Sequence, residues 1–122
     1  EVAKKTPEKI VEYYLNPLDK FLPYQGREIA IKMGIPTPLI PKIGMVIWKL
    51  FNILQKYDAT IAEINPLVVN ENDIIAADAK LEIDDDALYR QKELTILENI
   101  TKDEFAYIKL KEILQLLVMV QD

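Results

Sequence analysis

The sequence contains no cysteine and no histidine among its 122 residues, and only three glycines. Without cysteine, the chain can form neither a disulfide nor a thiolate metal site, and it has no cysteine nucleophile. Without histidine, any reaction that needs an imidazole must take it from another chain. The net charge of −5 argues against a nucleic-acid partner or an anionic membrane surface, because both repel acidic proteins. A reducing, cytoplasmic setting fits these absences.

Long hydrophobic runs are missing too. No apolar run approaches the ~20 residues that a membrane-spanning helix needs, and no signal peptide is visible. Half of the chain (50%) is nevertheless hydrophobic, which is enough for the core of one domain. Because the chain opens at Glu1 without a methionine, we expect it to be a fragment of a longer protein.

Start signals, stop signals and apolar spacing predict three helices in the first half of the chain. They are expected from Thr6 to Leu15, from Gln25 to Met33 and from about Pro41 to Tyr57, with an extended connection through Pro36, Pro38 and Pro41. Thr6 is a suitable N-cap, and Gly34 is a suitable C-cap for the second helix. On the third helix, Trp48 and Phe51 suit either a partner surface or core packing, and core packing is favoured.

The second half begins with a predicted β-hairpin. Its strands are expected over Thr60–Val69 and Ile74–Ile83, on either side of a turn cluster at Asn70–Asp73. The acids Asp84, Asp85 and Asp86 are typical of a helix cap, here for a short helix over Ala87–Arg90, although three acids also suit a metal site. Another short helix near Lys102–Phe105 and an apolar end over Ala106–Val120 complete the prediction.

Three polar residues interrupt the apolar hairpin strands: Glu63, Asn65 and Asp78. With the turn centred on Glu71 and Asn72, Asn65 faces Asp78 directly. Side chains opposed in an antiparallel pair have Cβ atoms roughly 4.5–5.5 Å apart, so an amide oxygen and a carboxylate can both reach one small cation. The hard ion Mg²⁺ is the natural candidate, and a single protein charge suits a metal that arrives with a nucleotide.

The same register allows a structural alternative. Glu63 faces Lys80, so these two could form a cross-strand ion pair on a solvated face, with Asn65 and Asp78 hydrogen-bonded beside it. Pro66 weakens the predicted register, because proline in a strand belongs at an edge or a bulge. The pattern by itself leaves both interpretations open.

Three segments resemble the β subunit of succinate–CoA ligase: "LPYQGREIAIKMGI" from Leu22, "EINPLVV" from Glu63 and "AADAKLEIDDDALYRQ" from Ala76. The similarity keeps the family's order and spacing over residues 1–110. It implies an α+β fold, the C-terminal lobe of an ATP-grasp domain, with a mainly antiparallel sheet and helices packed on it. A first lobe would precede Glu1, and a flavodoxin-like domain would follow the chain.

The resemblance also implies a function. That family makes succinyl-CoA, ADP and phosphate from succinate, CoA and ATP through a phosphohistidine on its α subunit. Its Mg²⁺ ligands match Asn65 and Asp78, and its glutamate beside the phosphohistidine matches Glu63. We expect the fragment alone to be inactive. Acetate–CoA and malate–CoA ligases share this lobe, and a noncatalytic binding module derived from it is the alternative.

The resemblance stops at the tail, residues 111–122, "KEILQLLVMVQD". The family continues there with a glycine-rich segment of the type "GDIAVIGNGAG", whose loop helps to bind the organic acid. Codons can be chosen for the tail that encode this segment in another reading frame. We therefore expect the tail to be an out-of-frame translation after a single-nucleotide change near Leu110, and the DNA at that codon tests it. An amphipathic terminal helix or strand packed on the core is the alternative.

Overall fold

The computed structural model describes residues 10–70 and 74–94, and it divides into one unit up to Lys49 and another from Leu50 onward. Residues 1–9 lie outside the described residues, and with them the first four residues, 6–9, of the first predicted helix. So do the short helix predicted near residues 102–105, the apolar end at 106–120 and the tail at 111–122. These expectations stay predictions.

In the first unit, helix α2 (Pro23–Lys32) has clear signals at both ends. Proline fits the first helical position, where no amide hydrogen is needed, and the Leu22 amide donates to Gln25 Oε1 at 2.8 Å. At the other end, Gly34 has φ 73° and its amide donates to the Ile31 carbonyl. The Ile35 amide donates to the Ala30 carbonyl, so the helix ends in a Schellman motif. The predicted helix and its glycine cap are confirmed, with a start two residues earlier than Gln25.

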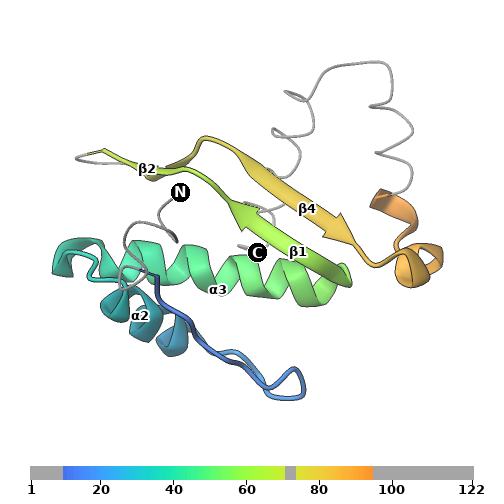
Figure 1. Ribbon diagram of the computed structural model, residues 1–122, viewed down its shortest axis with the longest axis horizontal. Coiled ribbons are helices and arrows are strands. Elements are labelled where there is room, and N and C mark those ends of the chain that lie inside the picture. Colours follow the sequence, from blue (N-terminus) through green and yellow to red (C-terminus); the bar gives the residue numbers. More distant parts are fainter. Residues whose placement is uncertain (1–9, 71–73, 95–122) are drawn as a thin grey trace. The chain divides into compact units, whose positions relative to one another are not determined.

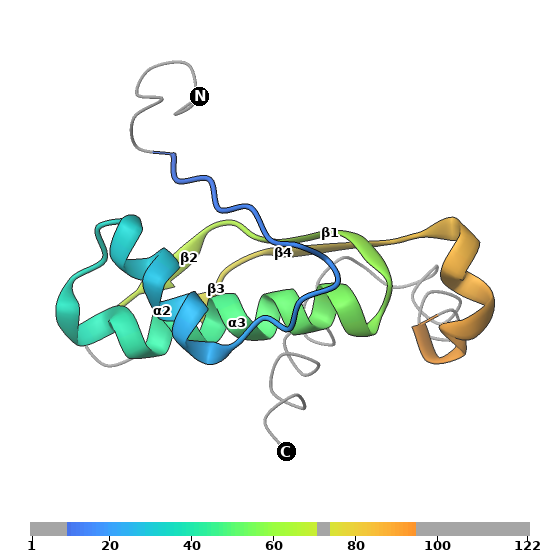
Figure 2. The ribbon, with the colours of Figure 1, turned by 90° about the horizontal axis from the view of Figure 1, so that it is seen from below.

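Two glycines set the spacing between α2 and the first part of helix α3 (Ile40–Lys56), which lie side by side in Figure 2. A Cβ atom on Gly26 would collide with the Gly44 carbonyl oxygen. A Cβ atom on Gly44 would lie 2.9 Å from the backbone of Arg27. The two backbones therefore touch at a crossing that admits no side chain at either position.

The first predicted helix is wrong where the structure describes it, because residues 10–15 are not helical. Side-chain contacts with α2 hold this segment instead. The Tyr13 hydroxyl donates to Glu28 Oε2 at 3.3 Å, and the Lys32 ammonium lies 4.7 Å from the centre of the Tyr13 ring. Local helix propensity is weak, and tertiary contacts of this kind routinely override it.

The extended connection predicted through Pro36, Pro38 and Pro41 is also wrong. A 3₁₀ turn, η2 (Thr37–Leu39), leads directly into α3, because prolines are accepted in a first helical turn. The continuous segment Thr37–Lys56 is long and apolar enough to cross a membrane by length and composition alone, contrary to the sequence expectation. Core helices of globular proteins pass the same test, and Ile43 on this helix is buried.

Trp48, also on α3, is half-buried, and its indole donates to the Phe21 carbonyl at 3.0 Å. This residue therefore packs within its own unit, as the favoured interpretation expected.

The second unit holds the predicted hairpin (Figure 1), and its strands pair in the predicted register. Strand β1 (Ala59–Ile64) pairs with β4 (Ala79–Ile83), and β2 (Leu67–Val69) pairs with β3 (Ile74–Ala76), both antiparallel. Glu63 lies opposite Lys80, as expected, and the register shifts only at a bulge between Ala59 and Ile61. In this unit, the buried hydrophobic residues among those described are Ile53, Tyr57 and Ala87.

Each predicted strand is in fact interrupted once. The breaks fall at Asn65-Pro66, whose peptide bond is cis, and at Ala77-Asp78. Backbone hydrogen bonds of 3.1 Å bridge them, from the Asn65 amide to the Asp78 carbonyl and from the Ala77 amide to the Pro66 carbonyl. Proline has no amide hydrogen to donate, so a regular ladder cannot pass through Pro66.

The acids after β4 cap a helix, as predicted. The helix is a 3₁₀ helix, η3 (Asp85–Arg90), which begins two residues before the expected Ala87. Asp84 Oδ1 accepts the amide of Asp86 at 3.0 Å. Among the described residues, no group of three or more acids could hold a metal ion, which favours the capping interpretation.

Candidate functional site

The break in the hairpin brings together the residues that the sequence singled out. The Asn65 amide donates to the Asp78 carbonyl at 3.1 Å, so these residues lie directly opposite each other. Glu63 precedes Asn65 by two positions and shares its face of the strand. The side chains of Glu63, Asn65 and Asp78 are all exposed. Three exposed, oxygen-bearing side chains therefore lie at neighbouring positions around the break in the hairpin.

The polar contacts of Asn65 and Asp78 are few and specific. Asn65 Nδ2 donates to Glu63 Oε1 at 3.2 Å. Asp78 Oδ1 accepts the amide of the next residue, Ala79, at 2.9 Å. These contacts leave the amide oxygen of Asn65 and the second carboxylate oxygen of Asp78 as the ends suited to a cation. Joint binding of one ion by the two oxygens stays a prediction.

The alternative ion pair between Glu63 and Lys80 does not form. Lys80 Nζ instead lies 2.5 Å from Glu82 Oε1, two positions along its own strand. The pKa of Lys80 is raised chiefly by the hydrogen bond with Glu82, then by the charge of Glu82, with the charge of Glu63 the least of the causes that raise it. Glu63 is thus engaged with Asn65 and not with the lysine opposite.

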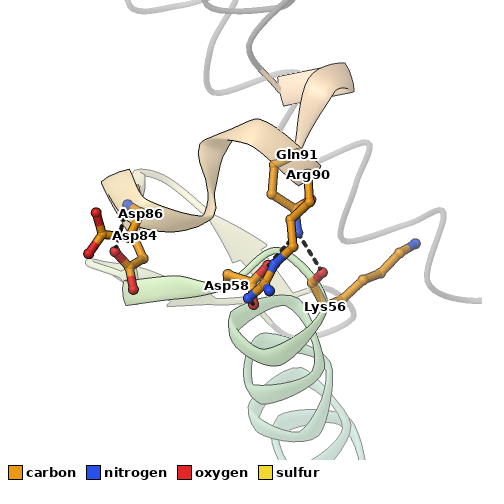
Figure 3. A network of polar contacts seen from close by, with 6 residues as sticks. All are labelled: Lys56, Asp58, Asp84, Asp86, Arg90 and Gln91. Atoms are coloured by element: carbon orange, nitrogen blue, oxygen red, sulfur yellow. Dashed lines mark hydrogen bonds and ion pairs between the residues drawn. The ribbon is translucent and has the colours of Figure 1, made fainter.

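A second polar cluster, which the sequence analysis missed, lies at the other end of β1 (Figure 3). The Asp58 carboxylate accepts two hydrogen bonds from Arg90, from Nε at 2.8 Å and from a terminal nitrogen at 2.6 Å. It accepts a third from Gln91 Nε2 at 2.7 Å, and the same nitrogen reaches the Lys56 carbonyl at 3.2 Å. We call Asp58, Arg90 and Gln91 the Asp58 cluster.

The backbone of Asp58 explains its position. Its φ of 53° is left-handed, a conformation in which aspartate and asparagine are enriched among non-glycine residues. The turn lets the chain leave α3 and enter β1, and the Asp58 carbonyl accepts the Asp84 amide at 2.9 Å. The sequence signal for this cluster was an aspartate between a helical pattern and a strand pattern. Nothing in the neighbouring sequence linked that aspartate to Arg90.

Hydrogen bonding shifts the protonation equilibria of this cluster. The hydrogen bond from Arg90, followed by that from Gln91, holds the pKa of Asp58 below its ordinary value. The hydrogen bond to Asp58, and then its charge, raise the pKa of Arg90. Both groups therefore stay charged at neutral pH, and the oxygens of Asp58 are already occupied. The cluster is suited to holding the fold and not to binding a ligand.

Comparison with known proteins gives one family match and several similar relatives. Residues 1–69 match the family of ATP-grasp domains. A "Succinate--CoA ligase [ADP-forming] subunit beta" from Methanothermobacter thermautotrophicus is 57% identical over 110 residues, which is 90% of this chain and 30% of that relative. Proteins with the same description from Methanocaldococcus jannaschii and Persephonella marina are 43% and 40% identical, over 90% and 92% of this chain and 31% and 29% of their own length.

These matches confirm the resemblance predicted from the sequence, and the chain spans about 30% of the length of the curated relatives it matches. The ATP-grasp match, together with helices and antiparallel strands, also confirms the predicted α+β class.

Proposed function

Because this chain belongs to the ATP-grasp family, we propose that it supplies part of the β subunit of an ADP-forming succinate–CoA ligase. The observation that carries this proposal is the opposition of Asn65 and Asp78 across the interrupted hairpin. The names of the matched relatives favour succinate over acetate or malate as the acid.

Asn65 and Asp78 fit a magnesium ion by the chemistry of their donors. Both offer hard oxygen atoms on an exposed face, and Mg²⁺ is usually held by one or two carboxylates together with substrate phosphates and water. Bound there, the ion would neutralise charge on the phosphates of ATP or ADP. The protein contributes only one negative charge through Asp78, which suits a metal that enters with its nucleotide.

Glu63 is the proposed catalytic residue. A carboxylate beside the phosphohistidine of the partner α subunit would orient its imidazole and stabilise positive charge on that ring during phosphoryl transfer. One oxygen of Glu63 accepts from Asn65, so the other is the oxygen directed to this role. The absence of histidine in the chain agrees with an imidazole supplied by a partner.

The proposed setting is the cytoplasm, with the α subunit, nucleotide, CoA and succinate as partners, and without nucleic acid or membrane. The chain by itself is proposed to be inactive, because it spans about 30% of the matched relatives. Its role is to form the Mg–nucleotide edge of the site.

The test replaces Asp78 by asparagine in the whole ligase, assembled with its α subunit, and measures histidine phosphorylation from labelled ATP against Mg²⁺ concentration. Replacing a direct ligand is expected to cost more than the roughly 10–100-fold typical of residues that only support a ligand. The fold is expected to persist, because an exposed isosteric change has little effect on stability. The matched control is Asp85→Asn, which changes an exposed acid in η3.

Equal rates for the two variants at limiting Mg²⁺ would overturn the metal role of Asp78. A whole protein that folds, binds its partner and phosphorylates no histidine under any condition would favour the noncatalytic binding module.

A further inference from the structure

The hydrogen bond between Asn65 and Glu63 raises a question of orientation. An asparagine amide has two chemically different ends, an oxygen that can bind a cation and an NH₂ group that cannot. Half a turn about the last side-chain bond exchanges them, with almost no change in shape. In an exposed asparagine, water can hydrogen-bond to the amide in both orientations. An asparagine therefore serves as a metal ligand only to the extent that something selects the oxygen-outward orientation.

Glu63 provides that selection. Its Oε1 accepts the Asn65 Nδ2 hydrogen at 3.2 Å. A carboxylate only accepts hydrogen bonds, so it holds the NH₂ end and would repel the oxygen end. With Nδ2 turned toward Glu63, Oδ1 is the end that remains for a cation beside Asp78, whose backbone lies opposite Asn65.

Lys80 is the residue best placed to disturb this arrangement. It lies directly opposite Glu63 in the ladder, and an ammonium group there would compete with the amide for the carboxylate. Its Nζ is held by Glu82 instead, at 2.5 Å. The Lys80–Glu82 ion pair thus leaves Glu63 to Asn65.

We propose that Glu63 is a positioning residue for the metal site, which fixes the Asn65 amide so that Oδ1 faces the divalent cation. This role rests on the proposed function and is separate from the role of Glu63 toward the phosphohistidine. Supporting hydrogen bonds of this kind orient metal ligands elsewhere, and their loss typically costs about 10–100-fold in metal affinity.

Two substitutions of Glu63 test the positioning role. Glu63→Gln leaves an amide that can either accept from Asn65 or donate to it, so it selects neither orientation, and Glu63→Ala removes the hydrogen-bonding group altogether. Mn²⁺ is titrated into the whole ligase with ADP present, and binding is followed by electron paramagnetic resonance, so no turnover is needed. We expect both substitutions to weaken Mn²⁺ binding, Glu63→Ala by about 10–100-fold. Phosphoryl transfer should be slow in both.

A third variant, Asn65→Asp, supplies the matched control. Its carboxylate has two equivalent oxygens, so no orientation has to be selected. In this background, Glu63→Ala should cause no loss of Mn²⁺ affinity, because the selection that Glu63 performs is no longer needed. Circular dichroism on each variant checks that the fold is retained.

The results divide cleanly. A loss of Mn²⁺ affinity on Glu63→Ala that is as large in the Asn65→Asp background as in the wild type overturns the positioning role, because charge and not orientation would then matter. Unchanged Mn²⁺ binding in Glu63→Ala, with binding lost in Asp78→Ala, also overturns it but leaves the metal site standing. Unchanged binding in Asp78→Ala overturns the metal site itself, and the positioning role with it.

Discussion

The two ends of the β1–β4 ladder carry polar clusters that are built in opposite ways. At one end, the Asp58 carboxylate accepts three hydrogen bonds from Arg90 and Gln91. At the other end, the Asp78 side chain accepts from a single backbone amide, and the Asn65 side chain donates to Glu63. A cluster whose oxygens are all used within the chain holds structure together. A cluster with oxygens to spare on an exposed face is able to bind something else.

The largest expected effect is that a substitution at one end lowers stability and a substitution at the other end lowers metal affinity. Asp58→Ala should lower the thermal midpoint of unfolding markedly, because it removes three hydrogen bonds and leaves the Arg90 charge without its partner, while Mn²⁺ affinity stays near the wild type. Asp78→Ala should leave the thermal midpoint near the wild type and weaken Mn²⁺ binding. Calorimetry and Mn²⁺ titration on both variants measure the two effects, and parallel changes in both quantities would break the comparison.

Acid should remove the contribution of the Asp58 cluster. The Arg90 and Gln91 hydrogen bonds lower the pKa of Asp58, so this carboxylate stabilises the fold above its ordinary pKa of 3.8 and loses the contribution as the pH falls through its folded value. The stability difference between the wild type and Asp58→Asn should therefore be constant near neutral pH and shrink below 3.8.

Urea unfolding at a series of pH values measures that difference. Asp19→Asn, which changes an exposed acid in the other unit, controls for general acid effects. A difference that grew on acidification would contradict the assigned sign.

A smaller loss is expected for Arg90→Lys. Lysine keeps the positive charge but presents a single ammonium, so it cannot span both oxygens of Asp58 as the guanidinium does. The thermal midpoint should fall between those of the wild type and Asp58→Ala. A midpoint equal to the wild type would mean that charge alone accounts for the pair, and that the bidentate geometry adds nothing.

The smallest effect on stability is expected for Glu82→Gln. Exposed ion pairs contribute little, so its thermal midpoint should match the wild type within error. Its effect on the metal end is the more informative one. Lys80 is then released toward Glu63, so Mn²⁺ binding should weaken modestly, and the further change Lys80→Met should restore it. Weakening that persists in the double variant would exclude competition by Lys80.

Much of this architecture could be predicted from the sequence. The apolar spacing of α3, the proline start and glycine end of α2, and the hairpin register that sets Asn65 against Asp78 all depend on neighbours within a few residues or across one turn. The aspartate cap after β4 is equally local. Local signals failed at residues 10–15, where Tyr13 bonds to a glutamate on α2 instead of continuing a helix.

The sequence by itself determined the register, because alternation and turn position leave a two-stranded antiparallel pair few ways to align its polar residues. Only the tertiary structure decided which partner each polar side chain takes. Asp58 pairs with Arg90 across 32 positions of sequence, and Lys80 pairs with Glu82 although Glu63 lies opposite it in the ladder. Register is fixed by backbone geometry that repeats along a strand, whereas the choice of a side-chain partner depends on rotamers and on groups that folding brings from elsewhere.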